Sequence, residues 1–324
     1  MSTKSRVLEY LEGHRGVEVS GQGLADELGV SRNAVWKAVA ALREDGYEIE
    51  SGTNRGHRFS ERNDILSAEG VRAALPVPLK GLNIVCLNEI DSTNNEAKRR
   101  IASGEGAPLL IAAASQTAGR GRRGRSFASP AGGAYFTLVL DNPAGGGQAV
   151  LATMAAAVAV VRALDACCID SGGIKWVNDI YVGGLKVCGI LSEAVSDLES
   201  GLVANVVVGI GINLDSASIP DELAGRAGAV SLRSGIDKNR LIAETVAAFL
   251  SIDPLCCGDE GRRALVEEYR ARSIIIGRPI EYEESGEMLP GVARAIDDDG
   301  ALVVELPDGA FKTLHGGEVT IRLG

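Results

Sequence analysis

The strongest chemical signal in the sequence is a short run of glycines and arginines, Gly119-Arg120-Gly121-Arg122-Arg123-Gly124-Arg125. Glycine allows backbone N–H groups to approach an anion closely, and a guanidinium binds phosphate or carboxylate through two parallel hydrogen bonds. The run lies between Gln116 and Phe127 rather than among lysines. We therefore favour a small anionic ligand, and general contact with nucleic acid is the alternative. The run is not a P-loop, because GxxxxGK[ST] is absent.

A second group of charges follows in Lys175-Trp176-Val177-Asn178-Asp179, with Lys186 seven residues after the aspartate. Lys186 stands directly before the apolar run Val187–Leu191. A cation at the start of a buried strand suits polarisation of a carboxylate or a phosphate. Asp179 could hold Mg²⁺ or accept a proton from an attacking amine. The alternative is an ordinary salt-bridged surface.

A third candidate, Asp91-Ser92-Thr93-Asn94, lies between a predicted strand and a predicted helix. Thr93 and Glu96 have the spacing of a capping box, which alone would explain them. Free backbone N–H groups and hydroxyls also meet ligands at such a corner. The motif is compatible with both roles.

The first sixty residues form a unit that precedes these motifs. Helical spacing predicts a helix over Ser5–Leu11, a second over Gly23–Val30 and a third that begins after Ser31. Two short strands around residues 47–49 and 57–59 follow, joined by a turn that contains glycine. This order predicts a winged helix-turn-helix domain.

The third helix begins with side chains that can contact phosphates and base edges. The candidate DNA-binding residues are Ser31, Arg32, Asn33, Trp36 and Lys37, together with Arg55 in the wing. Over residues 1–60, Lys+Arg number 8 and Asp+Glu number 9, so affinity for DNA must come from arrangement rather than bulk charge. A role in protein contacts is the alternative.

From residue 83 onward, strand-like and helical runs alternate, which predicts one α+β domain around a mixed sheet. The predicted strands are 83–88, 109–114, 134–140, 173–176, 186–193 and 203–212, and the predicted helices are 94–103, 150–165 and 239–251. The last fifty residues hold short strands separated by turn sequences, so we expect a small β-barrel there. We place the domain boundaries at 1–62, 63–272 and 273–324.

Composition limits the class of protein. The chain has 324 residues, of which 45% are hydrophobic and 23% charged, which is typical of a globular protein rather than a disordered or fibrous one. Six cysteines form no CxxC pair, so neither a zinc knuckle nor a disulfide framework is indicated. The N-terminus lacks the apolar core of a signal peptide, and the apolar run Ala149–Val161 is too short to span a bilayer. We expect a buried helix in that run and a cytoplasmic protein with no membrane partner.

Taken together, the motifs closely resemble those of the biotin protein ligases. The matching segments are Asp91–Asn94, Gln116, Gly119–Arg125, Lys175-Trp176-x-Asn178-Asp179, Lys186-x-x-Gly189-Ile190-Leu191 and Gly209-x-Gly211-Ile212-Asn213. With the winged helix in front, nearly the whole chain is similar to family members that are both biotin operon repressor and biotin–[acetyl-CoA-carboxylase] ligase. It departs from the family at Val177, where proline is usual, and at Phe127, where tryptophan typically lies near the adenine.

The resemblance implies a biotin/lipoate ligase-type central domain, an SH3-like C-terminal barrel and a two-step reaction. Biotin and ATP would form biotinyl-5′-AMP with Mg²⁺, and a lysine of a biotin carboxyl carrier protein would then displace AMP. Lys186, Arg122 and Asp179 would be catalytic, and Asp179 would also be the metal ligand. The residues that would bind biotin, the adenylate or ATP are Ser92, Thr93, Asn94, Gln116, Arg120, Gly121, Arg122, Lys186, Asn213 and Arg322.

The resemblance also implies regulation. With the adenylate bound, a homodimer would present two winged helices to the operator DNA of biotin genes. Three alternatives remain open at this point. They are a ligase whose N-terminal domain does not bind DNA, a non-catalytic regulator that responds to the adenylate, and a ligase for lipoate or octanoate.

Overall fold

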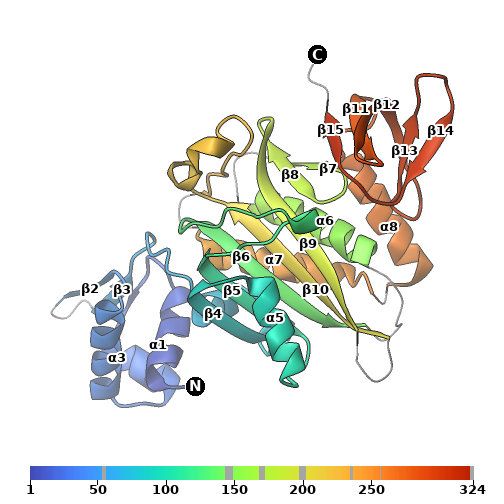
Figure 1. The fold of residues 1–324 in the computed structure, drawn as a ribbon. Coiled ribbons are helices and arrows are strands. Elements are labelled where there is room, and N and C mark those ends of the chain that lie inside the picture. Colours follow the sequence, from blue (N-terminus) through green and yellow to red (C-terminus); the bar gives the residue numbers. More distant parts are fainter. Residues whose placement is uncertain are drawn as a thin grey trace.

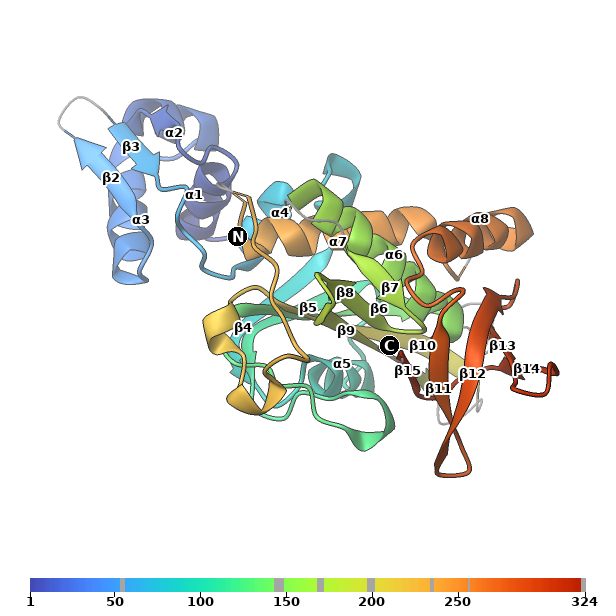
Figure 2. The same cartoon turned by 90° about the horizontal axis from the view of Figure 1, so that it is seen from above.

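The computed structural model describes residues 1–52, 56–142, 149–167, 172–196, 202–233, 236–255 and 257–321. They fold into three successive parts, each with its own β-sheet (Figure 1). The N-terminal part, in blue, and the C-terminal part, in red, lie at opposite ends of the central domain in both views (Figures 1 and 2). The central sheet therefore has a neighbouring domain on each side.

The N-terminal part has the predicted order of helices and strands. Its helices are α1 (Thr3–Glu12), α2 (Gly21–Leu28) and α3 (Arg32–Glu44), and its antiparallel sheet has the order β1 (Glu18–Val19), β3 (Gly56–Phe59), β2 (Ile49–Gly52). The hydroxyls of Ser2, Ser20 and Ser31 each cap a helix by accepting a hydrogen bond from a backbone N–H in its first turn. The predicted winged helix-turn-helix fold is confirmed.

The candidate DNA-binding side chains lie together at the start of α3. Val35, Val39 and Leu42 of this helix face the core. The exposed positions of its N-terminal half and cap are Ser31, Arg32, Asn33, Trp36 and Lys37. The indole of Trp36 is notable, because the residue is 64% exposed although it is large and apolar. The sixth candidate, Arg55, lies outside the described residues.

A buried polar network joins the N-terminal part to the central domain. The guanidinium of Arg15 donates to the Glu12 carboxylate (Nε–Oε2 2.8 Å) and to the Asn63 carbonyl (2.7 Å), and it pairs with Asp237, which caps α7 (Lys238–Ile252). Glu12 and Asp237 are only 8% and 6% exposed. Burial raises the pKa of Glu12 to about 7. Arg15 therefore compensates buried negative charge contributed by both domains.

Replacing Arg15 with alanine should lower the free energy of unfolding by about 3–5 kcal/mol, because two buried carboxylates would lose their cation. A urea titration followed by circular dichroism measures this change. Arg58→Ala is the control, since Arg58 donates an exposed hydrogen bond to the Gly16 carbonyl, and its loss should cost less than about 1 kcal/mol. Equal losses in the two variants would contradict the role given to Arg15.

The central domain is built on a seven-stranded sheet. Its strands, in spatial order, are β4 (Asn83–Ile90), β5 (Leu109–Gln116), β6 (Gly133–Asp141), β10 (Val203–Asn213), β9 (Leu185–Ser196), β8 (Asp179–Val182) and β7 (Gly173–Lys175). β4 and β5 run parallel, and the other neighbouring pairs run antiparallel. The predicted mixed sheet is confirmed.

Helices cover both faces of this sheet. α6 (Ala149–Cys167) and α7 lie over one face, with α4 (Ala68–Ala74) and α8 (Gly258–Ala271) nearby, and α5 (Thr93–Ala102) lies over the other (Figure 2). The sequence pattern predicts α5, α6 and α7 but not α4 or α8. α4 has only seven residues. α8 is rich in charged residues and buries only Leu265, Val266 and Tyr269, so few apolar residues mark it in the sequence.

α6 is the central helix of the hydrophobic core. It is long and apolar enough by composition to cross a membrane, but 72% of its most apolar 18-residue stretch is buried in this fold. Its alanines and valines, from Ala152 to Leu164, pack in one cluster with residues of the sheet, α7 and α8. The expected buried helix is therefore found.

The C-terminal part is a five-stranded antiparallel sheet. Its order is β14 (Phe311–Leu314), β13 (Leu302–Glu305), β12 (Glu287–Ile296), β11 (Pro279–Glu284), β15 (Val319–Ile321). The ammonium of Lys312 in β14 pairs with Glu284 of β11 and lies 5.8 Å from the ring centroid of Tyr282. The sheet thus curls until one end strand approaches the other side. The small antiparallel domain is as expected, and its SH3-like barrel form stays a prediction.

Candidate active site

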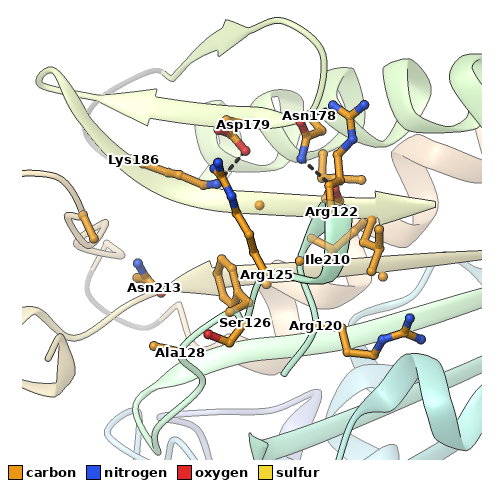
Figure 3. A pocket seen from close by; sticks show the side chains of 18 of the residues that line it. Arg120, Arg122, Arg125, Ser126, Ala128, Asn178, Asp179, Lys186, Ile210 and Asn213 are labelled. Carbon is orange, nitrogen blue, oxygen red and sulfur yellow. Dashed lines mark hydrogen bonds and ion pairs between the residues drawn. The ribbon is translucent and has the colours of Figure 1, made fainter. Parts of the chain in front are cut away.

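A cavity of about 440 Å³ lies on the face of the central sheet that carries α5. Figure 3 shows side chains that line it. Side chains alternate along β10, so Val207 packs in the cluster under α5, whereas Val206 and Val208 belong to the core around α6. Gly209 and Gly211 continue the α5 face of the strand and line the cavity. The sheet thus forms the floor beside α5.

Glycines on this floor make room for two larger side chains. A Cβ atom at Gly209 would lie 2.1 Å from Asn94 Oδ1, and a Cβ atom at Gly211 would lie 2.5 Å from the ring of Phe127. At Gly189 on β9 a Cβ atom would lie 2.9 Å from the same ring. These positions need glycine because Asn94 and Phe127 rest directly on the backbone of the sheet.

The corner between β4 and α5 forms one end of the cavity. The carboxamide Oε1 of Gln116 accepts hydrogen bonds from the Thr93 backbone N–H (2.8 Å) and hydroxyl (3.1 Å). Its Nε2 donates to the Ser129 hydroxyl at 2.8 Å. Ser92, Thr93, Asn94 and Gln116 all line the cavity, as the sequence predicts.

The predicted capping box at this corner does not form. Ser92, not Thr93, is the residue before the helix, and it makes no side-chain cap hydrogen bond. Glu96 instead binds Arg99 and Arg100. The hydroxyl of Thr93 is already engaged by Gln116, so tertiary contacts override the local capping pattern.

Thr137 was not among the candidate residues, yet it completes the corner. Its fully buried hydroxyl on β6 lies 2.8 Å from Thr93 Oγ1 and 2.7 Å from Asn94 Oδ1. The sequence signal is Thr137 itself, because the other residues of strand 134–140 are aliphatic or aromatic. Such a group needs a hydrogen-bonding partner when it is buried, and that requirement could have identified it.

The arginine loop lines the cavity with all four of its guanidinium groups, but each has a different partner. Arg120 lies 3.1 Å from Asn95 Oδ1 and 3.2 Å from Glu193 Oε1. Arg122 donates to Asn178 Oδ1 at 3.1 Å. Arg123 pairs with Glu283 and Arg125 with Glu318, both in the C-terminal domain. The guanidinium groups are therefore spread along the cavity rather than gathered at one point.

The turn inside this loop explains how the side chains diverge. A short 3-10 segment spans Arg122–Gly124, and Arg123 has a positive φ of 56°. The backbone N–H of Gly121 closes the turn by donating to the Arg125 carbonyl at 2.7 Å. Arg122 is half-buried at the cavity, where burial and the nearby charge of Arg123 lower the pKa of its guanidinium.

The KWxND segment and Lys186 form the opposite wall. Lys186 Nζ lies 2.6 Å from Asp179 Oδ1, while Arg120 lies on the other side of the cavity (Figure 3). Asn178 is fixed by its Nδ2, which donates to the Ile190 carbonyl at 2.9 Å. Lys175 also lines the cavity, and burial lowers the pKa of its ammonium.

Two candidates for the nucleotide side of the site remain, Asn213 and Arg322. Asn213, at the end of β10, lines the cavity and donates to the Gly228 carbonyl at 3.0 Å. Arg322 lies outside the described residues. Phe127, which replaces the usual tryptophan of the family, has its ring 6.4 Å from that of Tyr135 in an edge-to-face arrangement.

Comparison with known proteins agrees with this architecture. The HTH domain model matches residues 3–58, the biotin/lipoate A/B protein ligase family matches 87–213, and the biotin protein ligase C terminal domain matches 275–322. A biotin protein ligase from Aquifex aeolicus, solved in complex with biotin and ATP, has a similar fold with a TM-score of 0.62 and 24% identity. That match covers 75% of this chain and 99% of the other.

Fold and cavity thus define a protein of the biotin/lipoate ligase class with an added helix-turn-helix domain. The chain is 33% identical over 328 residues to the bifunctional ligase/repressor BirA of Bacillus spizizenii, with 99% of each chain covered. It is 29% identical over 306 residues to the protein of the same name from Escherichia coli, with 94% of this chain and 92% of that one covered. The chain belongs to the BirA family of bifunctional biotin ligase/repressors.

Proposed function

We propose that the chain is an ATP-dependent biotin protein ligase that forms biotinyl-5′-AMP and transfers the biotin to a lysine of a biotin carboxyl carrier protein. The observation that carries this proposal is the cavity, in which hydroxyl and amide groups at one end face arginine and lysine side chains. The polar, neutral end suits a vitamin ring that needs hydrogen bonds. The cationic wall suits the joining of a carboxylate to a phosphate.

In the first step the biotin carboxylate attacks the α-phosphate of ATP, and pyrophosphate leaves. Both reactants are anions, so positive charge must offset their repulsion. Lys186 and Arg122 supply it, and Arg122 is held by Asn178. The corner residues with Arg120 and Gly121 would hold biotin, and Asn213 and Arg322 would contact the nucleotide.

Asp179 is the candidate ligand for Mg²⁺. Within the described ranges, no group of three or more His, Cys, Asp or Glu side chains is arranged to hold a metal ion. A single carboxylate fits Mg²⁺, because this ion commonly binds through one or two carboxylates, water and substrate phosphates. When bound, it would neutralise phosphate charge.

In the second step the lysine amine of the carrier protein displaces AMP and forms an amide. Asp179 lines the cavity and would accept the proton that the amine loses. The mixed anhydride must be shielded from water until then. The arginine loop closes one side of the cavity, and its pairs with Glu283 and Glu318 link that wall to the C-terminal domain.

Intact-mass measurement tests the proposed reaction. Incubation with ATP, Mg²⁺, biotin and a carrier domain should add one biotinyl group to the carrier, and a carrier whose target lysine is arginine should gain none. An unmodified carrier would contradict the proposal. Pyrophosphate exchange with lipoate and octanoate is the companion experiment, because faster exchange with either acid would change the substrate assignment.

The fusion of a ligase with a winged helix supports regulated DNA binding. We infer that the adenylate orders the arginine loop and that a homodimer then presents two copies of α3 to a palindromic operator of biotin genes. Because ATP, the carrier protein and operator DNA are all found in the cytoplasm, we infer that the protein works there.

Sedimentation and gel shifts test this regulation. Biotin with ATP should convert the protein to a dimer, and the dimer should bind promoter DNA of biotin genes at a stated salt concentration. An unchanged oligomeric state would contradict the scheme. Ligase activity without a gel shift would indicate a monofunctional ligase instead.

A further inference from the structure

Behind the wall of the cavity lies a carboxylate that the proposed reaction does not use. Glu193 is on β9, its side chain is 18% exposed, and it is not one of the lining residues. Two of its partners do line the cavity. Asn94 Nδ2 donates to its Oε2 at 2.9 Å, and Arg120 Nη1 lies 3.2 Å from its Oε1.

The contact with Asn94 fixes which way that amide faces. Its Nδ2 donates to the Leu191 carbonyl (3.2 Å) and to Glu193, so both N–H groups are used. Its Oδ1 lies 2.7 Å from the Thr137 hydroxyl and rests against the bare backbone of Gly209. Asn94 is only 4% exposed, so leaving one of its N–H groups without an acceptor is costly. Glu193 thus helps to fix the Asn94 amide in one orientation.

The contact with Arg120 ties down the beginning of the arginine loop. The guanidinium of Arg120 is held between Asn95 Oδ1 and Glu193, against α5 and the sheet. The side chain of Arg120 is 41% exposed, so this ion pair is weaker than the less exposed hydrogen bond between Asn94 and Glu193. Lys98 Nζ, 2.7 Å from Glu193 Oε1, is a second cation that holds the carboxylate.

We propose that Glu193 is a positioning residue for the acid-binding half of the cavity: it orients the Asn94 amide and tethers Arg120 at the start of the arginine loop. This proposal rests on the proposed function, because the acid substrate is taken to be biotin. Burial alone would raise the pKa of Glu193, but Lys98, Asn94 and Arg120 together lower it. The carboxylate is therefore ionised and able to serve all three partners at neutral pH.

A purely structural carboxylate would behave differently. It would hold α5 on the sheet through Lys98, and its loss would lower stability or affect both substrates alike. A residue that positions the groups that bind biotin instead changes the KM for biotin and leaves the KM for ATP nearly unchanged. The two roles are therefore separable by kinetics.

The first variant is Glu193→Ala, assayed by pyrophosphate exchange. The KM for biotin should rise about tenfold, since one buried N–H of Asn94 loses its acceptor. The kcat and the KM for ATP should stay within about threefold of the wild type. A KM for biotin within about twofold of the wild type, or an equal rise in both KM values, would overturn the proposal.

Glu193→Gln separates the two contacts. Its carbonyl oxygen still accepts from Asn94, so the KM for biotin should return to within about threefold of the wild type. It carries no charge for Arg120, so amide hydrogen exchange of residues 117–129 should be about two- to fivefold faster in both variants. A KM as high as that of Glu193→Ala, or unchanged exchange in both variants, counts against the proposal.

Glu268→Ala is the matched control. Glu268 also bridges two arginines, Arg162 (2.9 Å) and Arg272 (3.3 Å), with a side-chain exposure of 26%, and it does not line the cavity. Glu268→Ala should leave the KM for biotin within about twofold of the wild type. If it raised this KM as much as Glu193→Ala does, the proposal would be overturned. Hydrogen exchange is measured without substrates. It therefore tests the loop tether even if the wild type were to activate no biotin, an outcome that would contradict only the proposed function.

Discussion

Replacing Lys186 with alanine is expected to slow the formation of biotinyl-5′-AMP by about 100- to 1,000-fold. The ammonium stands at the start of β9, lines the cavity and lies 2.6 Å from the Asp179 carboxylate. Bond formation between a carboxylate and a phosphate concentrates negative charge, and the ammonium offsets that charge. Pyrophosphate exchange at saturating biotin and ATP measures the rate.

Loss of Lys186 also leaves Asp179 without its ion-pair partner, which needs a separate control. In the double variant Lys186→Ala with Asp179→Asn, the uncompensated negative charge is gone but the ammonium is still missing. Asp179→Asn alone measures the cost of losing the carboxylate, and the rate of the double variant should lie well below that of this single variant. Recovery towards the wild-type rate would show that the orphaned carboxylate, rather than the absent cation, caused the loss, and the role assigned to Lys186 would be wrong.

Sequence reasoning identifies much of this site because its signals are local. Ser92, Gln116, Arg122 and Lys186 belong to short motifs at the ends of strands, and all four line one cavity. The strand and helix periods also predict the mixed sheet that brings these distant segments together. Local patterns are therefore enough to identify a site residue when its motif directly adjoins a strand in the sequence.

The contacts that the sequence does not predict depend on the tertiary structure. Thr137 and Glu193 lie on β6 and β9, and their partners Asn94 and Arg120 come from other segments of the chain. The capping box failed for the same reason, because Gln116, 23 residues away, takes the Thr93 hydroxyl. A local pattern cannot show which distant group will compete for the same hydrogen bond.

The sequence also does not predict that the four arginines of the loop bind different partners. Four guanidinium groups within seven residues suggest a single clamp, yet Arg123 and Arg125 pair with Glu283 and Glu318 of the C-terminal domain. In the sequence, Glu283 lies 160 residues after Arg123, and Glu318 lies 193 residues after Arg125. Arg122 is the member of the loop that the structure places half-buried beside Asn178, which makes it the arginine to test.

Replacing Arg122 with glycine should release the adenylate and make biotinylation unselective. The guanidinium lines the cavity, and we assign it to the phosphate of biotinyl-5′-AMP, so its loss removes a charge-assisted contact that retains this intermediate. Dissociation of labelled adenylate should become at least about tenfold faster, the loss of about 1.4 kcal/mol of binding free energy. The released anhydride then reacts with lysines in solution, so labelling of an unrelated protein should increase by a similar factor.

Arg123→Gly is the matched control for this effect. It removes an arginine from the same loop at a position whose φ of 56° suits glycine, so the backbone is not strained. Arg123 is paired with Glu283, and its loss should change adenylate dissociation by less than about threefold. If both variants released the adenylate equally fast, retention would depend on the total charge of the loop. If Arg122→Gly kept its selectivity for the carrier protein, another group must hold the phosphate, and Lys175, a half-buried cation lining the same cavity, would be the next to test.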